Sequence, residues 1–418
     1  MNFQELRVNK FLLKVLDELE FVYPTPIQKK TFRRITAGKD VVGIAPTGTG
    51  KTFAYLLPLL GMLEFSKEKH PRALIVLPTR ELVLQVKEEA LKLCKYKSLR
   101  IKDVYGGANI KTQIENLNDG GVDIIVGTPV RIFDIAVTGV IRFSNIKKLV
   151  IDEVDELLSL GFRPQLEQIL DILPQKRQNI MFSSTLEQDI EQFINRYFIE
   201  PEIIKIEDEN PPIERIKHLL YEVPNINTKI ELLKFLLSKN EFRKTLIFVS
   251  GKKLADYTYE KLREEGFDNI GVLHSNKAQN NRFNTIKLFE KGKIKALIAT
   301  DVVSRGLDFK EVSHVIHLSV PDSYNDFIHR VGRTGRAGAG GTEVLMISSL
   351  EKQPEFISDI PFEKIEIPDG ILVSTVLLEE EKQLNQQKNP VKVPDIKKGG
   401  GAFHEAGLKK KRIHKRKK

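Results

Sequence analysis

Residues 45–52, Ala45-Pro46-Thr47-Gly48-Thr49-Gly50-Lys51-Thr52, decide the fold that this sequence predicts. They follow a short apolar run, Val41-Val42-Gly43-Ile44, and precede a predicted helix. A strand, a glycine-rich loop ending in Lys-Thr and a helix together predict a phosphate-binding loop. Gly48 and Gly50 let backbone N–H groups turn toward phosphate oxygens, and the helix N-terminus adds positive charge. The alternative is an ordinary strand–helix turn that is rich in glycine and threonine.

Each residue type in this loop suits a nucleotide. Lys51 is expected to contact the β- and γ-phosphates, and the hydroxyl of Thr52 is expected to bind Mg²⁺. Ala45 departs from the usual pattern, because glycine normally stands at that position. The predicted phosphate-contacting set consists of Thr47, Gly48, Thr49, Gly50, Lys51 and Thr52.

An acidic motif, Asp152-Glu153-Val154-Asp155, follows the apolar run Leu149-Val150-Ile151. At the end of a strand, Asp152 is placed to hold Mg²⁺ directly or through water. Glu153 is placed to polarise an attacking water molecule. The alternative is that these carboxylates only stabilise the first turn of the next helix.

Apolar segments of strand length alternate with longer segments of helical spacing in both halves of the chain. The predicted strands are 41–44, 73–77, 122–126, 149–151 and 180–182 in the first half, and 245–249, 271–273, 296–299, 315–318 and 343–347 in the second. Continuous apolar runs are typical of parallel sheets covered on both faces. We therefore expect an α/β fold of two tandem domains, each a mostly parallel sheet flanked by helices.

The segment Glu207-Asp208-Glu209-Asn210-Pro211-Pro212 lies between the halves, and its charge and two prolines predict a linker. A chain of 418 residues is also too long for one compact domain. The predicted division is residues 1–207 for the first domain, 208–212 for the linker, 213–367 for the second domain, and 368–418 for a basic tail that is mostly disordered.

The net charge of +10 is concentrated in that tail, where residues 391–418 hold eleven Lys/Arg and two Asp/Glu. Such a block is usually solvated and often contacts nucleic acid, although a role in solubility or localisation stays open. The single cysteine, Cys94, excludes an internal disulfide. The apolar runs are far shorter than the ~18–20 residues that span a bilayer, and the N-terminus does not resemble a signal peptide. We therefore expect a cytoplasmic protein with no membrane partner; the basic tail could be a nuclear address if the source is eukaryotic.

The acidic motif resembles the Asp-Glu-Ala-Asp signature of the DEAD-box RNA helicases, with Val154 in place of Ala. Other motifs of that family follow in the same order, from residue 3 to the middle 360s. Pro24-Thr25-Pro26-Ile27-Gln28 resembles the adenine-reading Q motif. The resemblance implies that Gln28 hydrogen-bonds adenine, Phe21 stacks on it and Phe3 supports the site. It also implies two RecA-like domains and an RNA-dependent ATPase that unwinds short RNA duplexes or remodels RNA–protein complexes, with ATP and Mg²⁺ as cofactors.

Five segments resemble the RNA-backbone motifs of the family: residues 78–82, 106–107 and 128–131 in the first half, and 279–282 and 299–308 in the second. Contacts of this kind go mostly to phosphates and 2′-hydroxyls, and these motifs hold no aromatic stacking platform. We therefore expect little sequence preference for RNA. The resemblance implies RNA binding by Arg80, Gly107, Thr128, Arg131, Gln279, Arg282, Thr300 and Arg305.

The segment His329-Arg330-Val331-Gly332-Arg333-Thr334-Gly335-Arg336 resembles the arginine-rich motif VI of the family. The resemblance implies that Arg333 and Arg336 reach ATP from the second domain and that Asp301 approaches the ribose. ATP and RNA would then favour one closed form, because each gains contacts only there. The alternative for the arginines is a salt-bridged surface turn. Ser183-Ser184-Thr185 resembles the Ser-Ala-Thr motif, so that Ser183, Thr185 and Asp155 are expected to couple hydrolysis to unwinding.

Departures from the family pattern bear on rate and coupling rather than on the class. Val154 and Val130 replace Ala and Gly, Ser275 replaces a usual Gly, and Ser319 stands where Asp is frequent. Two other functions stay open: a DNA helicase or translocase, and an ATP-gated RNA clamp or scaffold. RNA is the expected partner, a monomer is the expected state, and ribosomal or RNA-decay proteins are candidates for further partners.

Overall fold

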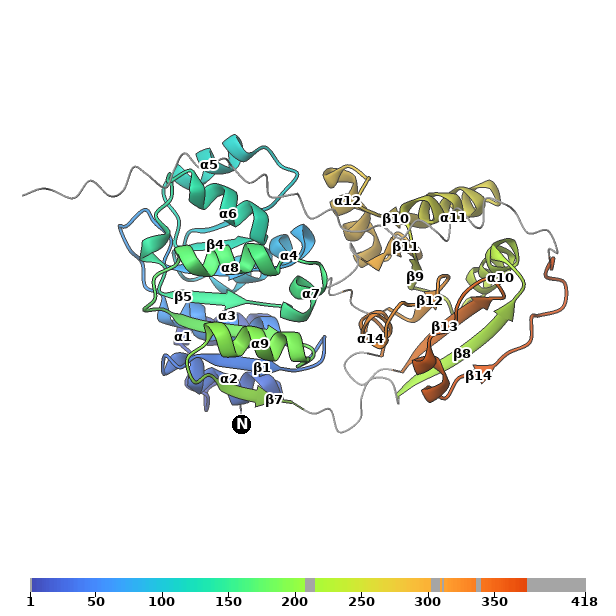
Figure 1. The fold of residues 1–418 in the computed structure, drawn as a ribbon, viewed down its shortest axis with the longest axis horizontal. Helices are drawn as coiled ribbons and strands as arrows, with labels where there is room; N and C mark the ends of the chain where they lie inside the picture. Colours follow the sequence, from blue (N-terminus) through green and yellow to red (C-terminus); the bar gives the residue numbers. More distant parts are fainter. Residues whose placement is uncertain (1, 207–214, 302–308, 310–311, 336–339, 374–418) are drawn as a thin grey trace, which may run out of the picture.

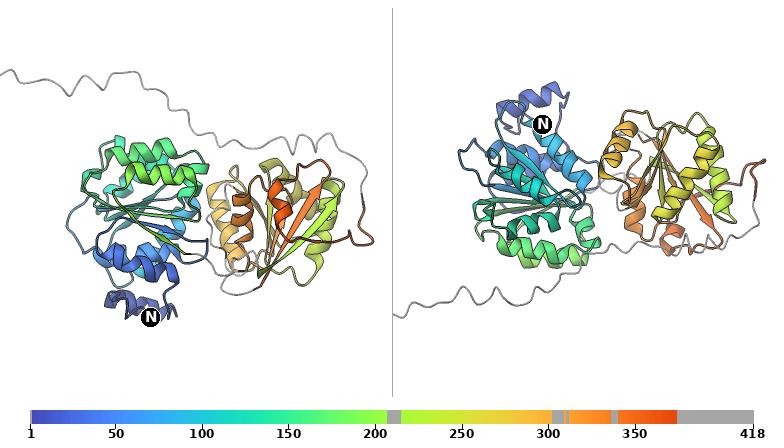
Figure 2. Two further views of the ribbon diagram at one scale, coloured as in Figure 1. Left: turned by 60° about the horizontal axis from the view of Figure 1, so that its bottom comes forward. Right: turned by 90° about the horizontal axis from the view of Figure 1, so that it is seen from above.

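The computed structural model describes residues 2–206, 215–301, 309, 312–335 and 340–373. These residues form two lobes that lie side by side in all three views (Figures 1 and 2). The predicted linker, residues 208–212, and most of the predicted tail fall outside the described residues. Within the described part, none of the helices has both the length and the apolar character needed to cross a membrane.

The first lobe contains a seven-stranded parallel sheet in the order β3-β4-β2-β5-β6-β1-β7. Successive strand residues point to opposite faces, so Val41 packs in one core and Val42 in the other. This explains the continuous apolar runs. The strands are β1 Val41–Ile44, β2 Ala73–Val76, β3 Ile101–Val104, β4 Ile124–Gly127, β5 Lys148–Ile151, β6 Gln178–Ser183 and β7 Glu202–Lys205.

Helices cover both faces of this sheet (Figure 1). The start of one of them is fixed by Gln28, whose side-chain oxygen accepts from the backbone N–H of Thr25, and by Pro26 in the first turn. One face carries α1 Lys10–Glu18, α2 Pro26–Thr36, α3 Lys51–Met62 and α4 Arg80–Leu93. The other carries α5 Ile110–Asn118, α6 Pro129–Val137, the 3₁₀ turn Phe143–Asn145, α7 Val154–Ser159, α8 Arg163–Ile172 and α9 Gln188–Tyr197.

The second lobe contains another seven-stranded parallel sheet, in the order β10-β11-β9-β12-β13-β8-β14. Its strands are β8 Ile216–Val223, β9 Thr245–Val249, β10 Ile270–Leu273, β11 Ala296–Thr300, β12 His314–His317, β13 Gly341–Ser348 and β14 Glu363–Lys364. Helices α10 Ile226–Ser238 and α11 Lys252–Glu264 pack on one face. The other face carries α12 Gln279–Glu290, α14 Tyr324–Val331 and the 3₁₀ turn Glu355–Asp359.

The predicted fold class is confirmed: each lobe is a parallel α/β unit, and every strand predicted from an apolar run is present. Four strands, β3, β7, β8 and β14, were not predicted. Three of these lie at sheet edges, where one side faces water and the apolar run is interrupted. The two sheets lie on either side of residues 207–214, as the predicted division requires, although its boundaries stay predictions.

Candidate active site

The phosphate loop lies between the end of β1 and the start of α3, as the sequence predicts. Gly48 and Gly50 have φ angles of 79° and 86°, in the left-handed region that favours glycine. A Cβ atom on Gly50 would also lie 2.5 Å from Nε2 of Gln28, which excludes a larger residue. The hydroxyl of Thr49 donates to the carbonyl of Pro46 at 2.7 Å and closes the loop.

Gln28 connects the predicted adenine site with this loop. Its Nε2 donates to the carbonyl of Gly50 at 3.1 Å, and its Oε1 accepts from the backbone N–H of Thr25 at 3.0 Å. Phe21 is 41% exposed and packs edge-on against Phe53 of α3, with 5.2 Å between ring centroids. An exposed ring at this place leaves a face for a base. Phe3 is buried in the core beside α2 and α3, which agrees with a supporting position.

The acidic motif lies at the C-terminal end of β5, beside the phosphate loop. Glu153 has a φ of 51°, and its backbone N–H donates to Oδ1 of Asp152 at 2.9 Å. The Nζ of Lys51 lies 3.4 Å from Oε2 of Glu153, and both side chains are buried. Burial lowers the pKa of Lys51, but the three acidic groups of the motif outweigh this effect and raise it. The site therefore holds a charged lysine among carboxylates.

Thr52 and Asp152 are the predicted ligands of Mg²⁺, and their surroundings fit a small cation. Burial and the neighbouring Glu153 raise the pKa of Asp152 to about 7, so a positive charge beside it would stabilise the carboxylate. Burial and Asp152 raise the pKa of the Tyr55 hydroxyl well above its ordinary value, while Thr52 lowers it. The Tyr55 hydroxyl is buried near both predicted ligands and has no hydrogen-bond partner among the described residues. Mg²⁺ commonly takes one or two protein oxygens and completes its shell with phosphates and water.

The arginine-rich segment of the second lobe lies against the phosphate loop. A Cβ atom on Gly332 would lie 3.0 Å from Oγ1 of Thr47, so the backbone of Gly332 approaches the Thr47 side chain across the lobe boundary. Arg333 is buried, and its Nε donates to the carbonyl of His329 at 3.0 Å. Arg336, the other predicted arginine, lies outside the described residues. The surface-turn alternative is therefore wrong for Arg333.

His329 joins the two lobes. Its Nδ1 lies 2.6 Å from Oε1 of Glu156, and its Nε2 lies 2.9 Å from the hydroxyl of Ser184 and 3.5 Å from Oδ2 of Asp155. Burial lowers the pKa of His329, but hydrogen bonds to Asp155 and Glu156 outweigh it and raise the pKa to about 9. Burial raises the pKa of Asp155, but His329, Lys51 and Ser184 hold it well below its usual range. The contact is therefore an ion pair near neutral pH.

These contacts involve one of the predicted coupling residues and a neighbour of the other two, and the coupling function of all three stays a prediction. Asp155 takes part, but the interlobe serine is Ser184, whose hydroxyl contacts both Asp155 and His329. The hydroxyls of Ser183 and Thr185 are buried without a hydrogen-bond partner among the described residues. Ser183 is the last residue of β6 and is fully buried. Glu156 was not predicted; its position directly after the acidic motif, in the first turn of α7, is the signal that could have found it.

Four predicted RNA-binding residues lie together at the lobe boundary. Arg80, at the start of α4, donates from Nη1 to Oε1 of Gln279 at 3.1 Å. Its guanidinium also covers the backbone of Gly107, because a Cβ there would lie 2.1 Å from Nη1. Arg282 places Nη2 at 2.5 Å from Oε1 of Glu81, and both side chains are buried. Glu81 lies in the predicted RNA-backbone segment 78–82, but no function was predicted for it.

The other predicted RNA-binding residues have different positions. Arg131 is buried behind the Gly107 turn, and its Nη1 donates to the carbonyl of Ala108 and to Oε1 of Gln113 at 3.0 and 2.9 Å. It therefore supports that turn from the inside. Thr128 precedes α6 and Thr300 ends β11, and both are buried. Arg305 lies outside the described residues.

Asp301, predicted to approach the ribose, forms a two-pronged ion pair within its own lobe. Its carboxylate oxygens lie 2.7 Å from Nε and 2.7 Å from Nη2 of Arg330. Arg330 is thus held by the residue that follows β11, and it was not predicted to have a function. A ribose contact by Asp301 stays a prediction.

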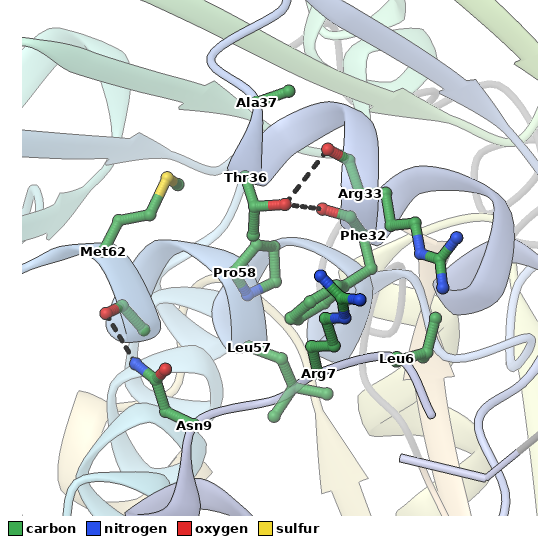
Figure 3. A pocket seen from close by; sticks show the side chains of 11 residues that line it. Leu6, Arg7, Asn9, Phe32, Arg33, Thr36, Ala37, Leu57, Pro58 and Met62 are labelled. Atoms are coloured by element: carbon green, nitrogen blue, oxygen red, sulfur yellow. Dashed lines mark hydrogen bonds between the residues drawn. The ribbon is translucent and has the colours of Figure 1, made fainter. Parts of the chain in front are cut away.

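A surface hollow of about 600 Å³ lies at the opposite ends of α2 and α3 from this site (Figure 3). The site uses the first turns of these helices, at Gln28 and Lys51, whereas the hollow uses their last turns. Arg7 and Arg33 both line it (Figure 3). The hollow is therefore not part of the candidate active site. Its lining includes Leu6, Asn9, Phe32, Leu57, Pro58 and Met62.

Comparisons with protein families agree with this geometry. Residues 25–193 match the DEAD/DEAH box helicase family, and residues 228–338 match the helicase conserved C-terminal domain. The chain is 35% identical over 350 residues to the ATP-dependent RNA helicase RhlB of Pseudomonas syringae pv. tomato, covering 82% of this chain and 88% of that protein. It is 37% identical over 349 residues to the DEAD-box ATP-dependent RNA helicase CshA of Bacillus cereus, covering 84% of this chain. The matched region spans only 66% of the length of that CshA.

Solved structures give the same result. Saccharomyces cerevisiae Dbp5 bound to RNA and ADP BeF3 matches with a TM-score of 0.76 and 27% identity, covering 88% of this chain and 95% of that one. Mss116p bound to single-stranded RNA and AMP-PNP matches with a TM-score of 0.75 and 30% identity, covering 83% of this chain and 74% of that one. The likeness to nucleotide-bound and RNA-bound proteins extends over both lobes, which identifies each lobe as RecA-like.

Proposed function

This chain belongs to the DEAD/DEAH box helicase family, and on that premise we propose that it is an ATP-dependent RNA helicase. It binds the RNA backbone across both lobes and opens short duplexes or remodels RNA–protein complexes as it hydrolyses ATP. The observation that carries the proposal is the approach of Gly332 to Thr47, which places the arginine-rich segment against the phosphate loop. A nucleotide in that loop would meet groups from both lobes.

ATP binding would use the groups already held at the strand ends of the first lobe. Gln28 reads the adenine, and the backbone N–H groups of the loop and Nζ of Lys51 bind the phosphates. Glu153 pairs with Lys51 at 3.4 Å. When the γ-phosphate gives Lys51 another anionic partner, Glu153 becomes available to accept a proton from the attacking water. Mg²⁺ held by Thr52 and Asp152 would neutralise charge on the phosphates.

Hydrolysis would require the second lobe. Arg333, together with Arg336, would stabilise negative charge on the transferring phosphoryl group, an effect worth about 10³–10⁵ in rate for arginines of this kind. His329 would hold the lobes together by its contacts with Asp155 and Glu156. ATP and RNA therefore favour the same closed arrangement.

The Asp-Glu-Val-Asp motif would serve as the DEAD signature of this chain. The side chain of Val154 is fully buried in the core on the α7 face of the sheet, whereas Asp152 and Glu153 lie beside Lys51. Replacing Ala by Val at this point adds apolar volume away from the carboxylates. It therefore changes packing under the motif and keeps the three acidic groups.

RNA would bind where Arg80 and the Gly107 turn meet Gln279 across the boundary. Protein contacts now occupy part of this set, since Arg80 donates to Gln279 and Arg282 pairs with Glu81. An RNA phosphate would compete for the Arg80 guanidinium, while Arg282 stays in its buried pair. We therefore propose that RNA contacts Arg80 and Gly107 in preference to Arg282.

ATP hydrolysis by the full chain tests the proposal, measured with single-stranded RNA, with single-stranded DNA and without nucleic acid. Stimulation by RNA above DNA is expected, together with separation of a short RNA duplex. Glu153→Gln should bind ATP and RNA and hydrolyse poorly. Equal stimulation by DNA would favour a DNA translocase, and RNA binding without turnover would favour an ATP-gated clamp.

The basic tail would add RNA affinity by charge alone. Deletion of residues 391–418 removes eleven Lys/Arg and two Asp/Glu. RNA binding should weaken, and its dependence on salt concentration should become flatter. Binding and salt dependence equal to those of the full chain would give the tail another function. We further propose a cytoplasmic monomer, with ribosomal or RNA-decay proteins as candidate partners.

A further inference from the structure

A line of buried polar side chains crosses the sheet of the second lobe and ends at the lobe boundary. It runs from His218 on β8 through Glu343 on β13 and His317 on β12 to Arg330 on α14 and Asp301 after β11. The three strands are neighbours in the sheet (Figure 1). Glu343 is 0% exposed and Arg330 is 3% exposed. Charged groups at this depth are rare unless each has a partner, so the contacts along the line require an explanation.

Contacts link each member of the line to the next. His218 and Glu343 are register partners on adjacent strands, and Nδ1 of His218 contacts Oε2 of Glu343. Oε1 of Glu343 lies 3.3 Å from Nε2 of His317. Nδ1 of His317 lies 3.3 Å from Nη1 of Arg330, and Arg330 holds Asp301 through two contacts of 2.7 Å.

The contact between Arg330 and His317 fixes where the imidazole proton lies. An arginine guanidinium can only donate, so Nδ1 of His317 must accept, and the proton of the neutral ring must be on Nε2. That nitrogen faces Glu343. Burial, with the charges of Arg330 and His218, lowers the pKa of His317 well below its ordinary value, so the ring is neutral. An ionised Glu343 stabilises this tautomer by its charge, because its Oε1 lies 3.3 Å from Nε2, although the two atoms do not form a hydrogen bond.

Arg330 depends on this tautomer for one of its fixed contacts. Its Nη1 also donates to the carbonyl of Ser319 at 2.8 Å, and its guanidinium lies 5.2 Å from the ring centre of Phe248. On α14, Phe327 stacks on His317 with ring centroids 5.6 Å apart and so shields the line from water. Arg330 directly follows His329, whose side chain reaches the first lobe and whose carbonyl accepts from Arg333.

We infer that His218, Glu343 and His317 are positioning residues for the arginine-rich segment. The Glu343 carboxylate selects the His317 tautomer that can accept from Arg330. Arg330, held in this way together with Asp301, sets the place of His329 and Arg333 at the lobe boundary. The inference deepens the proposed function, because it assigns these side chains to the same interlobe step.

The titratable and charged groups that face Glu343 give the line a dependence on pH. They are His218 from β8, His317 from β12 and Arg330 from α14. Burial raises the pKa of Glu343 to about 7, although His218 and Arg330 oppose the shift. Above about pH 7, Glu343 is therefore ionised and can select the His317 tautomer. Below that pH a protonated Glu343 no longer selects the Nε2 proton, and turnover should fall.

Glu343→Gln tests the inference, since the amide has the same shape and has no charge at any pH. We expect kcat for RNA-stimulated ATP hydrolysis to fall about tenfold, the scale typical of groups that orient a catalytic residue through another. KM for ATP should change less than about twofold, because the phosphate loop is untouched. The acid limb of the kcat profile near pH 7 should disappear. Val344→Ala, the matched control, removes buried volume from the next residue of β13 and should lower thermal stability without changing that limb.

Nitrogen-15 NMR of labelled histidines reads the tautomer without relying on activity. The chain has eight histidines, and His317→Asn identifies the signals of His317 by their loss. The proton should be on Nε2 in the unaltered protein and shift toward Nδ1 in Glu343→Gln. A proton on Nδ1 in the unaltered protein overturns the inference, as does an unchanged kcat in Glu343→Gln or an equal kcat loss in Val344→Ala. A chain that hydrolyses no ATP with RNA would instead overturn the proposed function, and the tautomer would still decide the proton arrangement.

Discussion

The two lobes have the same strand order, β3-β4-β2-β5-β6-β1-β7 in the first and β10-β11-β9-β12-β13-β8-β14 in the second. Strand β1 therefore corresponds to β8, and β6 to β13. The corresponding strands differ in what they carry. The apolar β1 leads into the phosphate loop, whereas β8 carries His218 and β13 carries Glu343 in its buried interior. The same scaffold holds a ligand site at its strand ends in one lobe and a buried polar line in the other.

This difference indicates a division of labour between the lobes. In the proposed function, the first lobe binds nucleotide with backbone N–H groups and a lysine that are fixed by its own fold. The second lobe presents long cationic side chains to a site outside itself. Such side chains have many conformers, so their positions must be fixed by contacts within the lobe. Four changes test this comparison.

The largest effect is expected from Lys51→Ala, which removes the cation of the first lobe. ATP binding and hydrolysis should both be lost, because the phosphates lose their lysine and Glu153 loses its partner at 3.4 Å. Nucleotide affinity and turnover measure this. Lys67→Ala, on an exposed loop of the same lobe, is the control and should behave like the unaltered chain. Retained ATP affinity in Lys51→Ala would contradict the assignment of the nucleotide site to the first lobe.

Arg333→Ala sharpens the comparison, because it should separate binding from turnover. Hydrolysis should fall by about 10³–10⁵, whereas nucleotide affinity should stay nearly constant. Single-turnover ATP hydrolysis and equilibrium nucleotide binding measure the two quantities. Arg243→Ala changes an exposed arginine of the same lobe and should affect neither. Normal turnover in Arg333→Ala would end the interlobe mechanism.

A smaller effect is expected at the buried pair of Glu81 and Arg282, which joins α4 to α12 across the boundary. Either single change to Ala leaves the other charge buried without its partner, so RNA-dependent closure should weaken about tenfold. The double change should cost less than the sum of the two single changes. The RNA concentration at half-maximal ATPase activity gives these values. Additive effects would show that the pair does not couple the lobes.

The smallest effect concerns pH and His329. Its pKa is about 9 in the contact with Asp155 and Glu156, whereas an imidazole in water titrates near ~6.5. Proton-linked support for closure is therefore complete below about pH 6.5 and is lost as pH rises through about 9. Energy transfer between dyes at Glu68→Cys and Glu260→Cys would follow closure with ATP and RNA. His329→Gln should make closure less dependent on pH.

The native cysteine does not interfere with that labelling. Burial raises the pKa of the Cys94 thiol to about 11, so it stays protonated and reacts slowly near neutral pH. Closure that stays equally pH-dependent in His329→Gln would assign the titration to another group.

Much of this architecture could be predicted from the sequence, because apolar runs and glycine spacing report local backbone requirements. The run Val41–Ile44 followed by Gly48 and Gly50 predicts a strand and a phosphate loop, and both are present. Strand β8 escaped prediction, because His218 and charged neighbours interrupt its apolar pattern. The partners of a buried polar residue come from other strands, so they cannot be predicted from the sequence of one segment.

The same limit applies at the lobe boundary. The family motif drew attention to Ser183 and Thr185, but the direction of each side chain depends on where β6 ends, and Ser184 makes the contact. Glu81 and Glu156 act through residues about two hundred positions away in the chain. Pairings of this kind appear only when both sheets are assembled.

The hydrogen bond from Gln28 to the carbonyl of Gly50 has a consequence for nucleotide choice. The side chain that is expected to recognise the base also grips the last residue before α3. A mismatched base would disturb Gly50, which shapes the loop that binds the phosphates of the same nucleotide. Guanine or pyrimidine nucleotides should therefore bind weakly for two reasons. The base fits Gln28 badly, and the phosphates are poorly placed in the loop.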